Sequence, residues 1–236
     1  MELPIFGENL INKMPRIARL VIPEVPHHIT QRGNYQQNIF FGDSDRVKYL
    51  SLVAEYVKTQ KVEVLAYCLM NNHIHFAVVP YQSDSLGIMF NQISMRYSQY
   101  FNKKLGKRGH LWQDRYYSCP LDNDHLYEVL RYIENNPVKA GIVKSAEKYR
   151  WSSAKAHIHN NIEDDDILSD YSKYLKEIDN WNEYLREDSN DEKISNIIKC
   201  TSNGRPAGNN QFIKELESKT SRNLRSKPMG RPKKDN

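Results

Sequence analysis

Two histidines separated by one residue are the first candidates for chemistry in this sequence. His73 and His75 flank Ile74 in a short apolar stretch that is typical of a β-strand. Alternate residues of a strand point to the same face, so both imidazoles leave the sheet together while Ile74 packs inward. Two imidazoles on one face are the minimum for holding a divalent metal, which needs at least one further ligand. Ordinary surface or core histidines are the alternative interpretation, and for an isolated pair they are the commoner case.

A tyrosine and an asparagine four residues apart form a second pair. Tyr132 and Asn136 lie in a stretch with helical spacing, which makes them neighbours on one helix face. A phenol beside an amide oxygen can act as a nucleophile beside a metal ligand. The alternative is a tyrosine at the rim of the core and an asparagine that ends the helix. Because Asn136 precedes Pro137, we expect the helix to stop there.

Basic and aromatic residues alternate in the segment that follows residue 95. Cations neutralise phosphates and aromatic rings stack on unpaired bases, so the segment predicts contact with single-stranded nucleic acid. We expect Tyr97 and Trp112 to belong to the core instead. The candidate DNA-binding residues here, with Arg32 added from an earlier strand, are Lys103, Lys104, Lys107, Arg108, Arg115, Tyr116 and Tyr117.

These residues must be positioned by a small set of secondary-structure elements. Apolar spacing and turn signals predict strand, helix, a hairpin of two strands, helix, strand and a further helix. The expected ranges are 26–32, 43–57, 62–69, 73–79, 86–101, 111–119 and 122–136. This order predicts an α+β fold of the ferredoxin-like or RRM-like split βαβ kind, with an antiparallel sheet. Helices on one face would leave the other face of the sheet for a ligand.

Charge is distributed unevenly along the chain. The net charge of the 236 residues is +5, but residues 161–199 carry −7 and residues 200–236 carry +6. Basic regions on both sides of an acidic one indicate a polyanionic partner, most simply nucleic acid. A solvated basic surface would give the same charges.

Three widely separated cysteines exclude a disulfide framework and a CxxC zinc site, and they are typical of a reducing compartment. The longest apolar run, residues 64–70, is seven residues long, whereas a membrane helix needs about 20. We therefore expect a cytoplasmic, nucleoid-associated protein.

The composition predicts three regions: a main domain over 1–160 that holds the candidate catalytic residues, an acidic helical linker over 161–199, and a partly disordered basic tail over 200–236. A Gly-Arg-Pro sequence occurs twice in the tail, at 204–206 and 230–232. The second copy resembles an AT-hook, which lays an arginine into the narrow A·T minor groove, so Arg231, Lys233 and Lys234 are further DNA-binding candidates. A disordered tail that contacts only phosphates is the alternative.

Five stretches in fixed order resemble the single-tyrosine HUH transposases (IS200-like), and among them the REP-associated tyrosine transposases. The resemblance runs over roughly residues 14–158. The stretches read MPRIARLVIPEVPHHITQRGNYQQNIFF, CLMNNHIHFAVVP, GHLWQDRYYS, RYIENNPVKAGIV and YRWSSAKAH. The ordered set is far more specific than any one motif.

The resemblance implies roles for the residues singled out above. His73, His75 and Asn136 would hold Mg²⁺ or Mn²⁺, and Tyr132 would be the nucleophile. It implies cleavage of single-stranded DNA at hairpin-forming repeats through a 5′-phosphotyrosine, with later strand joining that needs no ATP. The family's loop before the histidines usually reads Met-Pro-Asn, and here Asn71 replaces the proline.

Two other functions remain open at this level. A non-catalytic RRM-like module would share the fold and the basic-aromatic face, but it would not need the two histidines, the tyrosine and the asparagine together. A zinc hydrolase would need further His and Asp ligands, whereas Phe76-Ala77-Val78 follows His75. The expected partner is single-stranded DNA with hairpin repeats, and the sequence allows either a monomer or a homodimer.

Overall fold

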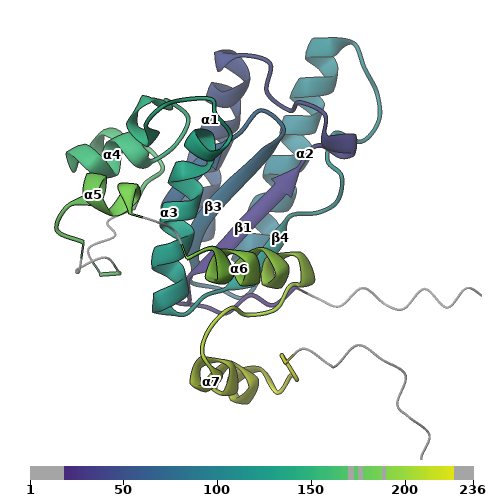
Figure 1. Cartoon of the computed structure of the whole chain (residues 1–236). Helices are drawn as coiled ribbons and strands as arrows, with labels where there is room; N and C mark the ends of the chain where they lie inside the picture. Colours follow the sequence, from purple (N-terminus) through teal and green to yellow (C-terminus); the bar gives the residue numbers. More distant parts are fainter. Residues whose placement is uncertain (1–18, 170–172, 175–177, 188–189, 226–236) are drawn as a thin grey trace, which may run out of the picture.

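The computed structural model describes residues 19–169, 173–174, 178–187 and 190–225 (Figure 1). The first six strands and helices follow the order β-α-β-β-α-β, as the sequence predicts. They are β1 (His27–Arg32), α1 (Asp43–Gln60), β2 (Val62–Leu69), β3 (His73–Pro80), α2 (Ser85–Leu105) and β4 (Tyr117–Pro120). After these come α3 (Asn123–Lys139), α4 (Ala154–His159), α5 (Trp181–Arg186), α6 (Asp191–Asn203) and α7 (Asn210–Thr220).

The four strands form one antiparallel sheet in the order β2-β3-β1-β4. This strand order is the ferredoxin-like arrangement, so the predicted α+β fold class is confirmed. The central strand β3 pairs with β1 on one side and with β2 on the other. The hairpin turn at residues 71–72 places His73 at the start of β3, at one end of the sheet.

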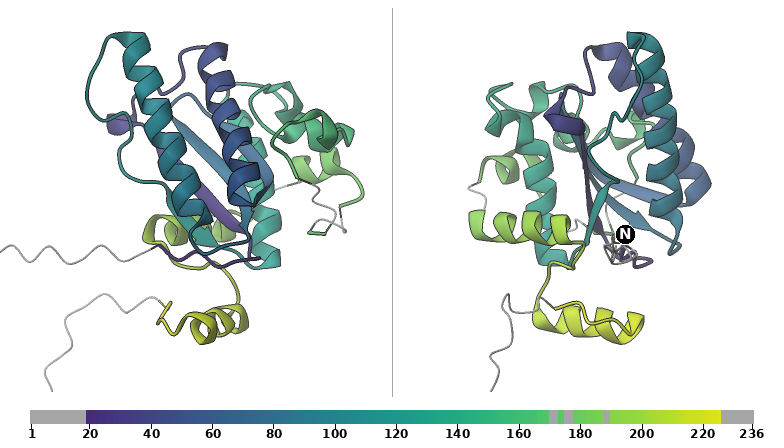
Figure 2. Two further views of the ribbon diagram at one scale, coloured as in Figure 1. Left: turned by 180° about the vertical axis from the view of Figure 1, so that it is seen from behind. Right: turned by 90° about the vertical axis from the view of Figure 1, so that its right-hand side faces the viewer.

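Helices cover both faces of the sheet (Figure 2). α1 and α2 pack side by side on one face, where Ile74, Phe76 and Phe90 are fully buried. On the opposite face α3 lies over β2 and β3, and α6 lies over β4 and β1. The expectation of an open ligand face is therefore wrong, because α3 and a helix from the C-terminal part of the chain occupy it.

Two local predictions need correction. α3 does not stop before Pro137 but runs through it to Lys139. Proline removes one backbone donor, yet Pro137 is buried, and the Ala140 amide still donates to the Asn136 carbonyl at 2.9 Å. The extended segment expected over 111–119 contains a strand only from Tyr117 onward.

The C-terminal part of the chain packs on the sheet domain. The predicted boundary at residue 200 falls inside α6, and the backbone of Ala207 bonds to Pro120 and Asp122 at the end of β4. Gly204, from the first Gly-Arg-Pro sequence, ends α6 in a left-handed conformation with φ of 65°, so this copy has a structural role. A small second core joins α7 to the segment before β1 through Leu20, Ile22 and Leu216.

How the chain divides into independently folding units stays a prediction. None of the helices in the described residues is long and apolar enough to cross a membrane.

Candidate active site

β3 carries the two histidines of the His-x-His pair. The pleat of the strand turns both side chains to the face that α3 covers, and their ring centroids lie 4.9 Å apart at an interplanar angle of 88°. His75 is 5% exposed, whereas His73 at the start of the strand is half-buried. The site therefore opens toward the hairpin end of the sheet.

α3 brings the tyrosine and the asparagine to the same place. The ring of Tyr132 stands edge-on to that of His75, with 5.3 Å between centroids. Asn136, one turn further along, forms a side-chain hydrogen bond to the Tyr132 hydroxyl. The sequence-predicted residues His73, His75, Tyr132 and Asn136 thus form one cluster between β3 and α3.

A third histidine, which the sequence argument did not single out, belongs to the same cluster. His28 on β1 meets His75 edge to edge: the two rings are nearly parallel, at 7°, with centroids 5.3 Å apart, and His28 Nε2 lies 3.0 Å from His75 Nδ1. Its ring is also edge-on to Tyr132, at 6.1 Å. The alternation of the predicted strand 26–32 places His28 on the same face as Thr30 and Arg32. This pattern could have identified His28 as a residue that faces the site.

Burial governs the protonation of these groups. Loss of solvent lowers the pKa of His28 to about 3 and, with a smaller contribution from the Arg32 cation, that of His73 to about 4. Burial and the neighbouring histidines hold the pKa of His75 well below its usual range. All three rings are therefore neutral at pH 7, which is the form that binds a metal.

The donor set can be tested against a metal ion. His73 Nδ1 lies 2.6 Å from the Asn72 side-chain oxygen, which can only accept, and the Asn72 amide nitrogen donates to the Gln36 carbonyl at 3.3 Å. The His73 proton is therefore on Nδ1, and Nε2 keeps its lone pair. Two imidazole nitrogens and the Asn136 amide oxygen fit a divalent cation with open positions. Across the described ranges, no three His, Cys, Asp or Glu side chains gather as a metal site.

The predicted DNA-binding residues lie near the hairpin end of the sheet. The loop after α2 runs beside β1, where the Gln113 amide donates to the Arg32 carbonyl at 2.9 Å and Trp112 pairs with Gly33. Arg32 is the strand partner of His73, so this basic loop borders the histidines. The exposed members of the set are Arg32, Lys103, Lys104, Lys107, Arg108 and Arg115, and Tyr117 is half-buried.

Two residues of that set differ from the expectation, Tyr116 by its burial and Lys104 by its ion pair. Tyr116 is only 2% exposed, because its ring packs 5.1 Å from Phe90 and under the guanidinium of Arg19. A buried ring cannot stack on a base, so this prediction for Tyr116 is wrong. The Lys104 ammonium forms an ion pair with the buried Asp45, which neutralises its charge. Arg231, Lys233 and Lys234, the AT-hook candidates, lie outside the described residues.

A cavity of about 330 Å³ adjoins Tyr132 on the side of α3 away from the sheet. Its walls come from α3, α5 and the segment between α3 and α4. Lys139, Lys144 and Arg186 contribute cations to the lining, and Glu147 and Glu187 contribute carboxyl groups. The tyrosine thus stands between the histidines and a cavity with a small excess of positive charge.

Comparison with known proteins gives a family match and several structural likenesses. Residues 22–136 match the family of IS200-like transposases. The comparison with curated proteins gave no match. A REP-associated tyrosine transposase bound to a REP hairpin is similar in structure, at 19% identity over 64% of this chain and 86% of that one, with a TM-score of 0.49.

Two further solved structures are similar over parts of the chain. A candidate transposase from Deinococcus radiodurans has 16% identity over 51% of this chain and 97% of that one, with a TM-score of 0.36. A bacterial tRNA(His) guanylyltransferase-like protein in complex with ATP has 11% identity over 69% and 72% of the two chains, with a TM-score of 0.37.

The family match spans the whole sheet together with both β3 histidines, Tyr132 and Asn136. The segment that carries the sheet and the candidate active site, just under half of the chain, is therefore similar to the IS200-like transposases.

Proposed function

We propose that this protein cleaves and rejoins single-stranded DNA at hairpin-forming repeats, with Tyr132 as the nucleophile and His73, His75 and Asn136 as ligands of Mg²⁺ or Mn²⁺. The observation that carries the proposal is the contact between α3 and β3, which places the Tyr132 ring 5.3 Å from that of His75. A nucleophile beside a pair of neutral imidazoles is the arrangement that metal-assisted transesterification needs.

The reaction balances without an external energy source. The Tyr132 oxygen attacks a phosphorus atom of the DNA backbone, and the bond from phosphorus to the 3′ oxygen breaks. The phosphate stays on the tyrosine as a 5′-phosphotyrosine ester, and the 3′ oxygen leaves as a hydroxyl. When a 3′-hydroxyl later attacks this ester, the strand is rejoined and the phenol is released, so no ATP is required.

The chain's own residues prepare the phenol for this step. Burial raises the pKa of Tyr132, while the hydrogen bond from Asn136 and the Arg32 cation act in the opposite direction. The cavity beside Tyr132, between α3 and α5, leaves space next to the phenol ring on the side away from the histidines. A bound divalent cation would stabilise negative charge on the phosphoryl oxygens and favour the ionised phenol.

A covalent adduct assay tests the proposal directly. The full-length protein is incubated with Mn²⁺ and single-stranded hairpin oligonucleotides drawn from repeats near its gene, and the products are separated under denaturing conditions. We expect a protein–DNA adduct that carries the 5′ end of one fragment. Tyr132→Phe keeps the ring but loses the attacking oxygen, so it should form no adduct while DNA binding is retained.

Tyr117→Phe is the matched control, since Tyr117 lies on β4 near the basic loop and outside the cluster. It should form the adduct at close to the wild-type rate. An adduct that persists in Tyr132→Phe would show that another residue attacks. DNA binding without an adduct, across a broad set of hairpins, would favour a non-catalytic nucleic-acid-binding module.

A further inference from the structure

We propose that Thr201, on α6, is a positioning residue that fixes which ring nitrogen His75 presents to the metal, acting through His28; this inference rests on the proposed function. Thr201, His28 and His75 come from three separate elements and form one chain of hydrogen bonds. The Thr201 hydroxyl oxygen lies 2.9 Å from His28 Nδ1, and His28 Nε2 lies 3.0 Å from His75 Nδ1. All three side chains are at most 5% exposed.

The donor-to-acceptor direction of these hydrogen bonds is set at Thr201, on α6. The Thr201 hydroxyl donates to the Ile197 carbonyl, one helical turn earlier, at 2.8 Å. A hydroxyl has a single proton, so the Thr201 oxygen can only accept from His28. The His28 proton must therefore be on Nδ1.

The position of the proton on His28 then determines which ring nitrogen of His75, the proposed metal ligand, carries a proton. A neutral imidazole with its proton on Nδ1 has a bare Nε2, so His28 accepts a hydrogen bond there. The donor is then His75 Nδ1–H, and in the neutral form of this ring Nε2 carries the lone pair that a metal requires. If the chain ran the other way, His75 would carry its proton on Nε2 and could not bind the metal through that atom.

Each histidine of the pair then has its own orienting partner. Asn72 holds the proton of His73 on Nδ1, within the hairpin turn next to the site. For His75 the same role falls to a residue 126 positions further along the chain, outside the family-matched segment 22–136. α6, which carries Thr201, is therefore a component of the catalytic unit.

The packing of α6 supports this role. Ile194, Ile197 and Thr201 are its buried residues and lie on one helix face, which rests on β4, α3 and β1. The two isoleucines supply apolar contact, so the hydroxyl of Thr201 is the polar group that this face directs at the histidines. Figure 1 shows α6 lying across the sheet beside α3.

Removal of one hydroxyl tests the inference in the full-length protein. Thr201→Val keeps the shape of the side chain but removes the acceptor. Long-range ¹H–¹⁵N correlation spectra of the metal-free protein report which nitrogen of each histidine carries the proton. We expect wild-type His28 and His75 to be protonated on Nδ1, and Thr201→Val to move the proton toward Nε2 in both rings. Mn²⁺ affinity, measured by calorimetry, should fall by about 10-fold or more.

Two variants serve as controls. Thr201→Ser restores the hydroxyl and should recover both the wild-type tautomer and the Mn²⁺ affinity. Ser202→Ala removes the neighbouring exposed hydroxyl, which bonds only to the Lys199 carbonyl, and should change neither. A thermal melt of each variant shows whether α6 remains folded.

Two results would overturn the inference: wild-type His75 protonated on Nε2, or Thr201→Val with unchanged tautomer and affinity. A wild-type protein that binds no Mn²⁺ would instead contradict the proposed function. The tautomers of the metal-free protein report on the Thr201 chain separately from metal binding, so the two failures are distinguishable.

Discussion

Opposing effects act on the Tyr132 phenol. Burial is the larger effect and raises its pKa, whereas the Asn136 hydrogen bond and the Arg32 cation oppose it. The phenol is therefore protonated at pH 7, where a free tyrosine with a pKa of about 10 is already almost entirely neutral. Under the proposed function, a buried neutral nucleophile beside neutral histidines should therefore need an added divalent cation for cleavage.

A thiol pair allows a pH measurement at the interface between α6 and β4. The Cys119 side chain hydrogen-bonds to Cys200 and lowers the pKa of Cys200 to about 7, while burial raises that of Cys119. We expect alkylation of Cys200 by iodoacetamide to increase with pH through a midpoint near 7. Cys119→Ala removes the donor, so the midpoint should rise toward the ordinary value of about 8.5.

Cys68→Ala is the matched control, because Cys68 is also buried but lies on β2 away from this interface. It should leave the midpoint in place. A midpoint that does not respond to Cys119→Ala would mean that Cys119 does not lower the pKa of Cys200.

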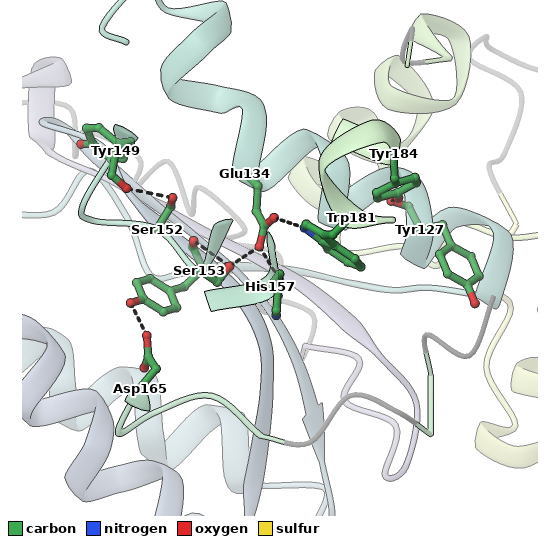
Figure 3. A network of polar contacts seen from close by, with 10 residues as sticks. Tyr127, Glu134, Tyr149, Ser152, Ser153, His157, Asp165, Trp181 and Tyr184 are labelled. Atoms are coloured by element: carbon green, nitrogen blue, oxygen red, sulfur yellow. Dashed lines mark hydrogen bonds and ion pairs between the residues drawn. The ribbon is translucent and has the colours of Figure 1, made fainter. Parts of the chain in front are cut away.

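At the scale of secondary-structure elements, α3 is held from two sides. One side lies on the sheet, and on the other a buried carboxyl group ties α3 to α4 and α5 (Figure 3). Glu134 accepts hydrogen bonds from Ser153 at 2.5 Å, His157 at 2.5 Å and the indole of Trp181 at 2.6 Å. This network keeps α3 against β3 and so sets the position of Tyr132.

Loss of this network should be costly. Glu134→Ala leaves three buried donors without an acceptor, and we expect the free energy of unfolding to fall by about 3 to 5 kcal/mol, measured by urea denaturation. Trp181→Phe removes one donor, and the fall should be about 1 to 3 kcal/mol. Arg150→Gln breaks an exposed ion pair with Asp43 and should cost less than about 1 kcal/mol. If Glu134→Ala unfolds at the same urea concentration as Arg150→Gln, the network does not stabilise α3.

At the scale of the whole molecule, the exposed basic side chains near the hairpin end of the sheet form the expected DNA-binding surface. Replacing Lys103, Lys107 and Arg108 with alanine should flatten the dependence of log affinity for single-stranded DNA on log salt by about 0.7 for each lost phosphate contact. Fluorescence anisotropy at several salt concentrations gives this slope. Lys104→Ala is the control, since its charge already pairs with Asp45 and the slope should not change. An unaltered slope in the triple variant would place the DNA elsewhere.

The ordered C-terminal helices suggest where truncation is tolerated. Deletion of residues 226–236 removes the AT-hook candidates, so binding to A·T-rich duplex should weaken while cleavage of a short hairpin oligonucleotide continues. Deletion of residues 190–236 also removes α6 with Thr201, and cleavage should fall at least 10-fold because His75 loses its orienting chain. Gel-based binding and cleavage assays compare the two proteins. If deletion of residues 226–236 alone abolishes cleavage, these residues are needed for catalysis and the expected tolerance is wrong.

Local patterns were enough to predict much of this molecule. Alternation along β3 put His73 and His75 on one face, and helical spacing put Tyr132 next to Asn136, because both relations depend only on the geometry of a single element. The order of strands and helices predicted the ferredoxin-like sheet, because few topologies accommodate the order β-α-β-β-α-β. Pro137 misled the prediction of the end of α3, since a buried proline near a helix end loses one hydrogen bond but keeps its packing.

Contacts between distant elements were decided only by the tertiary structure. The sequence does not state that α3 covers β3, that His28 hydrogen-bonds to His75, or that Tyr116 faces inward. The contact between His28 and Thr201 joins residues 173 positions apart, and it exists because the apolar face of α6 rests on the open side of β4 and β1. Apolar spacing shows that a helix has a face to bury but not which surface buries it, since any sufficiently apolar surface satisfies the same hydrophobic driving force.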